Sequence, residues 1–312
     1  MIISASRRTD IPAFFSEWFF NRLRDGYVYV RNPVVPQQVS SIDLSPEVVD
    51  GIVFWTKNPI PMLDKLDLLK DYMYYFQFTL TSYGQDVECG VPNKSRVLVP
   101  AFQRLSNQIS PERVIWRYDP IFLSKKYTVE YHIRYFEELA RRLAPYTERV
   151  VISFLNRYER VVRNMSPVGL VDFPDDQQIA LAKSLVEIAH SYGLEMQSCA
   201  ETLPLSDLGI VRSSCIDGVL LGKLLGCPLT VGRDKNQRTG CGCMESIDIG
   251  EYSTCRNGCR YCYANQRTNS VPYRAQRHDP NSPLLIGEVG PEDRVSVRKV
   301  VPLQDRQLKL AL

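Results

Sequence analysis

The sequence lacks the features that would assign it to a membrane, secreted or strongly charged class of protein. No apolar run approaches the roughly 18 residues of a membrane-spanning helix. The opening residues, IISASRRTDIP, become charged within seven positions and show no secretory signal. A net charge of +3 gives little reason to expect a nucleic acid or a membrane surface as partner. With 44% hydrophobic and 23% charged residues the chain is typical of a globular protein, which we expect in the cytoplasm.

Glycine motifs for phosphate binding are also absent. The segment SASRRTDIP, at the end of the first expected strand, contains no glycine, which argues against a dinucleotide-binding fingerprint. The chain has no Walker phosphate-binding loop. Its three histidines, His132, His190 and His278, fall in two expected helices and in the C-terminal segment, so none is well placed to be a general base.

Short apolar, β-branched runs alternate with amphipathic stretches over the first two-thirds of the chain. This alternation indicates βα units around a parallel sheet. The expected strands are 1–6, 51–56, 74–81, 113–122, 148–155 and 193–201, and the expected helices are 14–26, 62–72, 99–109, 128–143 and 175–193. Six units predict an α/β fold of the partial (β/α)6, TIM-like barrel type, with one further unit at 210–226. We expect a barrel over 1–229, a cysteine-rich segment over 230–270 that folds back over the barrel mouth, and a tail over 271–312 that packs on the barrel.

Polar residues collect where each of the six expected strands ends. Active sites of parallel barrels lie at the carboxyl ends of the strands, so these side chains predict a site there. They are Arg7, Arg8, Thr9, Asp10, Thr56, Lys57, Asn58, Gln77, Thr79, Thr81, Arg117, Asp119, Ser153, Asn156, Gln197, Cys199 and Glu201. Asp10 has a simpler role open to it, as the N-cap of the helix that follows.

Cysteines are concentrated in the last third of the chain, where eight of the nine lie between residues 199 and 262. In a reducing compartment such a group indicates metal binding rather than a disulfide framework. The segment CRNGCRYC places Cys255, Cys259 and Cys262 within eight residues, which is one cysteine too many for a zinc knuckle and one too few for a complete zinc site. Cys241 or Cys243 could complete a zinc site, whereas an iron–sulfur cube on three thiolates would leave one iron open to a ligand.

The spacing C-x3-C-x2-C, with an aromatic residue before the last cysteine, resembles the signature of the radical S-adenosylmethionine (SAM) superfamily. The resemblance implies a [4Fe–4S] cluster on Cys255, Cys259 and Cys262, with SAM on the open iron. It implies an electron donor such as a flavodoxin or ferredoxin, cleavage of SAM to a 5′-deoxyadenosyl radical, and hydrogen abstraction from a small-molecule or macromolecular substrate that the sequence does not identify. Tyr261 would lie near the adenine through its backbone. The expected SAM contacts are Thr56, Lys57, Asn58, Arg117, Asp119, Ser153 and Asn156.

Further segments are similar to the spore photoproduct lyase-like branch of that superfamily, namely CRNGCRYCYAN, FWTKNPIPMLDKLDLL and RVIWRYDPIF. The whole chain most resembles a bacterial family known as domain of unknown function 1848. Superfamily members usually carry the cysteine loop after the first strand and a glycine-glycine-glutamate element after the second. Here the cysteine loop lies near the C-terminus and TKN stands after the second strand. We therefore expect SRRTDIP to replace the usual loop and the C-terminal segment to return the cysteines to the barrel mouth.

The remaining cysteines leave several interpretations open. Cys199, Cys215, Cys241 and Cys243 could hold a second [4Fe–4S] cluster, a zinc ion or nothing, and Cys227 is typical of a small buried hydrophobe. Cys199 or Tyr118 could instead donate a hydrogen atom.

Two other functions stay open for the chain as a whole. An iron–sulfur electron carrier or redox sensor would bind no SAM, and a zinc-stabilised nucleic-acid-binding protein would use the locally basic RRTD, RNGCR and YRAQRHD. We expect no membrane partner, because no segment is apolar enough to enter one.

Overall fold

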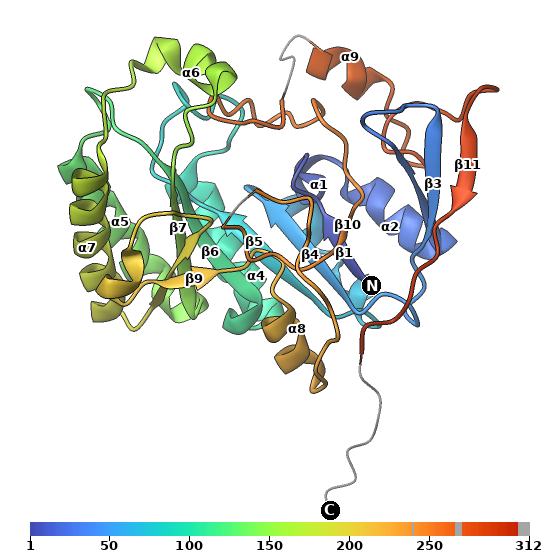
Figure 1. Cartoon of the computed structure of the whole chain (residues 1–312), viewed down its shortest axis with the longest axis horizontal. Coiled ribbons are helices and arrows are strands. Elements are labelled where there is room, and N and C mark those ends of the chain that lie inside the picture. Colours follow the sequence, from blue (N-terminus) through green and yellow to red (C-terminus); the bar gives the residue numbers. More distant parts are fainter. Residues whose placement is uncertain (239, 266–269, 305–312) are drawn as a thin grey trace, which may run out of the picture.

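The centre of the molecule is an open, parallel sheet of eight strands in the order β10-β1-β4-β5-β6-β7-β8-β9 (Figure 1). The computed structural model describes residues 1–238, 240–265 and 270–304. The sheet strands are β1 (Ile2–Ala5), β4 (Gly51–Thr56), β5 (Tyr74–Thr79), β6 (Val114–Ile121), β7 (Arg149–Phe154), β8 (Glu195–Cys199), β9 (Val211–Ser213) and β10 (Ile247–Asp248). Its two edges, β10 and β9, lie at opposite ends of this order, so the sheet is not a closed barrel.

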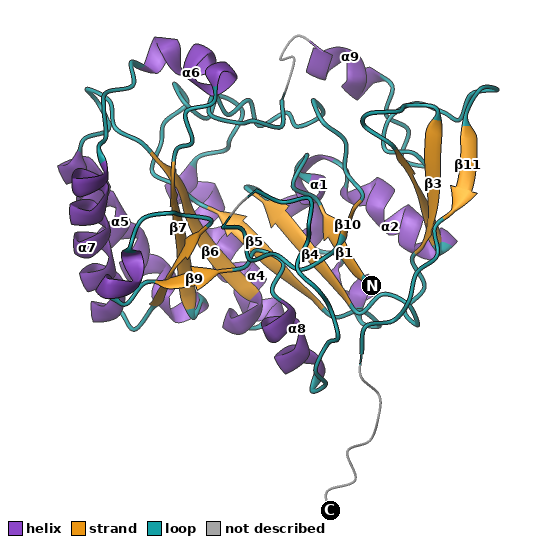
Figure 2. Ribbon diagram, in the orientation of Figure 1, coloured by secondary structure: helices purple, strands orange, loops and turns teal. Residues whose placement is uncertain are grey.

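Helices flank the sheet, and α4, α5 and α7 pack next to one another on its outer side (Figure 2). The helices are α1 (Ile11–Phe14), α2 (Ser16–Asp25), α3 (Ile60–Leu63), α4 (Val99–Ile109), α5 (Val129–Leu143), α6 (Glu159–Met165), α7 (Asp175–Ser191), α8 (Gly218–Leu225) and α9 (Ser270–Gln276). Their ends follow local chemistry, as when α2 stops at the left-handed Gly26 (φ 78°) and Thr128 caps α5 through the amide of Tyr131. No helix in these ranges is both long and apolar enough to cross a membrane.

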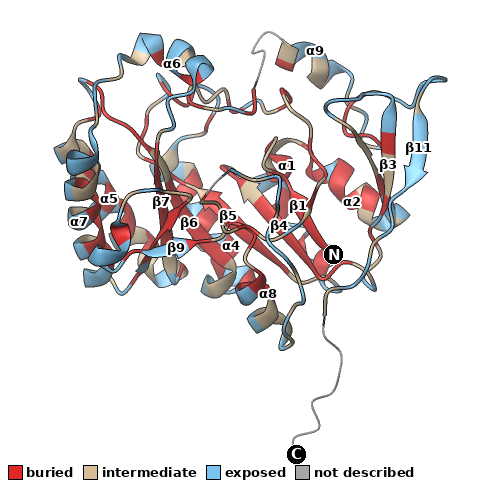
Figure 3. Ribbon diagram, in the orientation of Figure 1, coloured by how far each residue is buried: buried red, intermediate tan, exposed pale blue. Residues whose placement is uncertain are grey.

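The two faces of the sheet bury different sets of side chains because successive residues of a strand point to opposite sides. The outer face carries large residues such as Phe54, Phe76 and Trp116, which pack under the helices. The inner face carries a smaller layer that includes Val53 and Tyr75. Figure 3 shows the central strands as almost entirely buried. Above the inner layer the strands end in polar residues, and the site lies there.

The six expected strands are all present, and the expected unit at 210–226 forms β9 and α8. The single helix expected over 62–72 is wrong: α3 ends at Leu63, and a 3-10 helix follows at Leu66–Leu69. The three-residue turn of this helix places Leu66 and Leu69 on one side, where both are buried. A second, three-stranded sheet was not expected; it contains β2 (Tyr27–Arg31), β3 (Gln38–Asp43) and β11 (Arg294–Val297).

The C-terminal segment packs on the N-terminal part of the molecule. The indole Nε1 of Trp18, on α2, donates to the carbonyls of Ser282 (2.9 Å) and Leu284 (3.1 Å), and β11 pairs in parallel with β3. Residues 305–312 of the expected tail, and residues 239 and 266–269 of the expected cysteine-rich segment, lie outside the described residues.

Candidate metal and cofactor site

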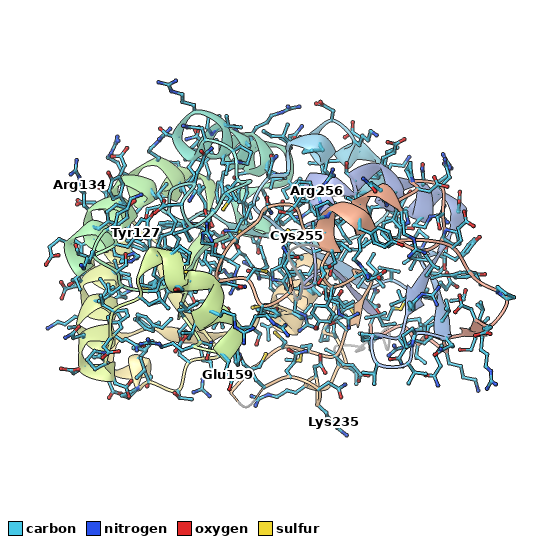
Figure 4. All side chains as sticks on the ribbon, turned by 90° about the horizontal axis from the view of Figure 1, so that it is seen from above. Tyr127, Arg134, Glu159, Lys235, Cys255 and Arg256 are labelled. Atoms are coloured by element: carbon cyan, nitrogen blue, oxygen red, sulfur yellow. The ribbon has the colours of Figure 1, made fainter. Side chains whose placement is uncertain are left out.

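A cavity of about 770 Å³ lies at the carboxyl ends of the sheet strands. Seven of the nine cysteines line it, whereas Cys89 and Cys227 do not. The seven are Cys199, Cys215, Cys241, Cys243, Cys255, Cys259 and Cys262. Seen from above, Cys255 lies near the middle of the molecule, far from Tyr127 and Arg134 at one side (Figure 4). The cavity is thus the place where most of the thiols of this chain meet.

The cysteine loop reaches the cavity because a short strand places it beside the first strand of the chain. Strand β10 pairs in parallel with β1, with Ile3 opposite Ile247 and Ser4 opposite Asp248. The carboxylate of Asp248 accepts hydrogen bonds from Ser4 Oγ (2.7 Å), Ser6 Oγ (2.6 Å) and the amide of Arg7 (2.8 Å). The loop that carries Cys255 therefore leaves the sheet at the same edge as the loop after β1.

A second segment, residues 87–90, holds the cysteine loop from the other side. The amide of Gly90 donates to the carbonyl of Asn257 (2.9 Å), and the amide of Arg260 donates to the carbonyl of Val87 (2.9 Å). A side chain on Gly90 would not fit, because its Cβ would lie 2.5 Å from the carbonyl oxygen of Arg256. The two segments are locked together through backbone contacts.

Asp10 is both a helix cap and a clamp on this loop. Its Oδ1 accepts from the amide of Ala13 (3.1 Å) and so caps α1. Its Oδ2 accepts from the amide of Lys57 (2.8 Å) and from Asn257 Nδ2 (2.9 Å). Burial raises the pKa of Asp10, although these hydrogen bonds oppose the shift. The simple capping role considered for Asp10 is present, and the clamp adds to it.

A buried ion network lies directly under the cysteine loop. Glu88, only 1% exposed, accepts from Lys57 Nζ (2.8 Å) and Thr81 Oγ1 (2.9 Å), and also binds Lys94 Nζ and the hydroxyl of Tyr261. Burial alone would raise the pKa of Glu88, but the two ammonium groups outweigh it and lower that pKa to about 2. Two cations and one anion leave a net positive charge beside Cys259. At Cys259 the charge of Lys57 opposes burial, which still raises the pKa of that thiol.

The three thiols of CRNGCRYC are held as neutral groups when no metal is bound. Burial raises the pKa of Cys255, Cys259 and Cys262, and at Cys259 the charge of Lys57 opposes that shift. No three His, Cys, Asp or Glu side chains in the described ranges converge on a single metal-ion position. The thiols instead border open space, and the adjacent Asn257 Oδ1 is buried without a hydrogen-bond partner in that part of the chain.

Most of the expected SAM contacts line the cavity. Thr56, Lys57, Arg117, Asp119, Ser153, Asn156 and Tyr261 do so. Asn58 is not among the lining residues: its Oδ1 accepts from the amide of Ile60 (3.2 Å) at the start of α3, which turns it toward the helix. Within the cavity wall, Arg117 donates from its Nη1 to Cys215 Sγ (3.0 Å), and its Nη2 pairs with Asp119.

Tyr118 is wrong as a hydrogen-atom donor to this cavity. It lies between Arg117 and Asp119 on β6, so the strand alternation places its ring on the outer face, where it contacts Trp116 and Phe136. Its hydroxyl meets Ser82 Oγ (2.9 Å) and His132 Nδ1 (3.0 Å).

His132 is equally remote from the chemistry expected at the cavity. Its Nε2 lies 2.9 Å from the carbonyl of Phe122, and burial lowers the pKa of its imidazole to about 4. Of the other two histidines, His190 is exposed on α7, and His278 contacts the carbonyl of Leu285 (2.8 Å).

Several residues that build the site were not predicted. Glu88 and Lys94 lie in segments with no periodic pattern, so nothing local marks them. Asp248 had a signal: in SIDI, the apolar Ile247 and Ile249 alternate with polar residues, which is typical of a strand. Asn257 stands within the cysteine motif itself and contributes through its amide.

Comparison with known proteins places the chain in a family. The sequence model of a family described as "Domain of unknown function (DUF1848)" matches residues 2–264. The matched region begins at β1 and ends two residues after Cys262, so it contains the cavity and the seven cysteines that line it. No curated protein and no solved structure matches the chain.

Proposed function

The chain belongs to the DUF1848 family, and we propose that it is a radical SAM enzyme. In this proposal the eight-stranded sheet acts as a partial TIM-like barrel with the cavity at its mouth. The enzyme would cleave SAM to a 5′-deoxyadenosyl radical that abstracts hydrogen from a substrate, with a flavodoxin or ferredoxin as reductant. The observation that carries the proposal is the position of CRNGCRYC at the carboxyl edge of the sheet, beside β1, in a cavity large enough for SAM.

Cys255, Cys259 and Cys262 would hold a [4Fe–4S] cluster. Bound by three thiolates, such a cluster supplies an iron with an open position and an electron for the cleavage of SAM. Lys57 and Lys94 offset the added negative charge from beneath, since Glu88 neutralises only one of them. Asp10 and the 87–90 segment fix the loop before any metal arrives. The cysteine loop would thus be in position before the cluster binds, and nearby lysines would offset the negative charge of the cluster.

Polar groups without partners mark where SAM would lie. Arg7 Nη1, Thr9 Oγ1 and Asn257 Oδ1 are buried and have no hydrogen-bond partner among the described residues, and all three residues line the cavity. Unsatisfied buried polar groups are costly, so they indicate a ligand that completes them. Ser153, Asn156 and Asp119 add further donors and acceptors to the same wall. A ligand rich in amino, carboxylate and hydroxyl groups matches this lining.

Anaerobic reconstitution with iron and sulfide tests the proposal. The dithionite-reduced protein should give an electron paramagnetic resonance (EPR) signal that changes when SAM is added, and turnover should release 5′-deoxyadenosine. Cys255→Ala should abolish both responses, whereas Cys227→Ala, outside the cavity lining, should leave them intact. A cluster signal indifferent to SAM would refute the proposal and favour an electron carrier. Stoichiometric zinc without iron would also refute it.

A further inference from the structure

Four cysteines outside CRNGCRYC form a continuous row on the wall of the same cavity. Cys199 Sγ lies 3.2 Å from Cys215 Sγ, and Cys243 and Cys241 lie close enough to Cys215 and to each other for their side chains to interact electrostatically. Cys199 ends β8, Cys215 follows β9, and the other two stand in the loop between α8 and β10. Three separate segments therefore deliver thiols to one place.

The backbone holds two of these segments in contact. The amide of Met244 donates to the carbonyl of Ile216 (3.1 Å), and Ser214 Oγ donates to the carbonyl of Gly242 (2.7 Å). Gly242 allows this approach because a Cβ there would lie 2.5 Å from Ser214 Oγ. The Cys-Gly-Cys sequence thus fits against the loop of Cys215 and turns two thiols to the same wall.

The thiols of the row are mostly buried, and guanidinium groups lie near two of them. Cys199, Cys215 and Cys243 are 8%, 7% and 3% exposed, so free thiols there would gain little from water. The guanidinium of Arg117 donates from Nη1 to Cys215 Sγ (3.0 Å), and the charge of Arg238 acts on Cys199. A buried guanidinium beside a thiol favours its ionised form.

The arrangement does not match a single zinc ion or a pair of disulfides. A tetrahedral zinc site sets its sulfur atoms about 3.8 Å apart around one centre. Here the thiols run in a row, and no three ligand side chains in the described part of the chain converge on one point. The four cysteines are free thiols, and no disulfide joins them. The row borders the cavity, which has room for a group larger than one ion.

We propose that Cys199, Cys215, Cys241 and Cys243 hold an iron–sulfur cluster of their own, with four thiolate ligands and no iron open to SAM. This centre is separate from the one on CRNGCRYC, although both face the same cavity. Cys199 is then a metal ligand rather than a hydrogen-atom donor.

Iron and acid-labile sulfide counts after anaerobic reconstitution test this second centre. The wild type should bind about eight irons per chain, as two [4Fe–4S] clusters. Two triple variants, Cys255→Ala/Cys259→Ala/Cys262→Ala and Cys199→Ser/Cys215→Ser/Cys243→Ser, should each keep about four. Cys227→Ala is the matched control and should keep the wild-type count. If the second triple variant fails to fold, Cys241→Ser replaces it, because this thiol is the least buried of the row; it should still lower the iron count.

The outcomes separate this inference from the proposed enzyme activity. A wild-type count of about four, with none left after removal of the CRNGCRYC thiols, overturns the second centre. One zinc and no iron in that variant overturns it too. About four irons in that variant, with an EPR signal that SAM does not change, supports it. The iron count of this variant tests the second cluster even if SAM perturbs neither centre and the radical SAM proposal fails.

Discussion

Replacing Glu88 with glutamine should destabilise the protein strongly at neutral pH, because it removes the carboxylate that pairs with two buried lysines. The contribution of Glu88 follows from its pKa, which is about 2 in the folded protein against an ordinary 4.5. At about 1.4 kcal/mol per pH unit, this difference is worth roughly 3 kcal/mol. Loss of one partner from a buried ion pair typically costs about 3–5 kcal/mol, which agrees. Lys57 and Lys94 would face each other without the charge that now separates them.

The stabilisation by Glu88 should weaken as the pH falls. The folded-state pKa is lowered, so the stabilisation is complete above the unfolded pKa of 4.5 and is lost as pH falls toward about 2. Urea unfolding of the metal-free, reduced protein should therefore show a difference of about 3 kcal/mol at pH 7 that narrows steadily below about pH 5. Glu187→Gln, an exposed site on α7, is the control and should change stability by less than about 0.5 kcal/mol. A loss below about 1 kcal/mol at pH 7, or a gap that does not change with pH, would refute this account of the network.

Two further predictions concern other positions. Gly90→Ala should reduce iron loading on the cysteine loop at least several-fold, because the new Cβ would lie 2.5 Å from the carbonyl oxygen of Arg256. Gly232→Ala is the control, since a Cβ there has nothing within 4 Å, and it should bind as much iron as the wild type. If Gly90→Ala binds as much iron as the wild type, the contact between the 87–90 segment and the cysteine loop does not hold the loop in place. His132 has its pKa lowered to about 4 from 6.5, so folding stability should decline as pH falls from about 6.5 to 4. His132→Gln should flatten that part of the pH profile, measured by thermal unfolding, and an unchanged slope would show that another group titrates there.

The strands of this fold were predictable because each one is a short, strongly apolar run followed by an amphipathic stretch. GIVFWT and VPAFQRLSNQI carry enough local pattern to place β4 and α4 at the observed bounds. Strand β10 was not predicted, because the alternation in SIDI spans four residues and is too short to stand out from the loops on either side. Its pairing with β1 depends on contacts between residues more than 240 positions apart, such as Ser4 with Asp248.

In the site, too, residues within local motifs could be predicted from the sequence, whereas those that depend on distant contacts could not. CRNGCRYC is a local motif, and polar residues at strand ends follow from the geometry of parallel sheets. The support beneath the motif is non-local: the carboxylate of Glu88 and the hydroxyl of Tyr261 come together across 173 positions of sequence. Nothing in VECG alone indicates that Glu88 will accept from two lysines. The position of Asn58 depends instead on local contacts, because its Oδ1 accepts from the amide of Ile60 at the start of the next helix.

The pairing of β10 with β1 also sets an order of events at the ribosome. A nascent chain grows at about 5–20 residues per second, so β9 is complete seconds before Cys255 leaves the exit tunnel. Until then β1 is an unprotected sheet edge, able to recruit a foreign strand, and only the arrival of Ile247–Asp248 covers it. The same short strand that protects the edge brings Cys255, Cys259 and Cys262 into place. Delivery of these three thiols to the sheet edge is therefore a late step of folding, and a ribosome that stalls before Ile247 is made leaves a chain with neither its edge covered nor its motif delivered.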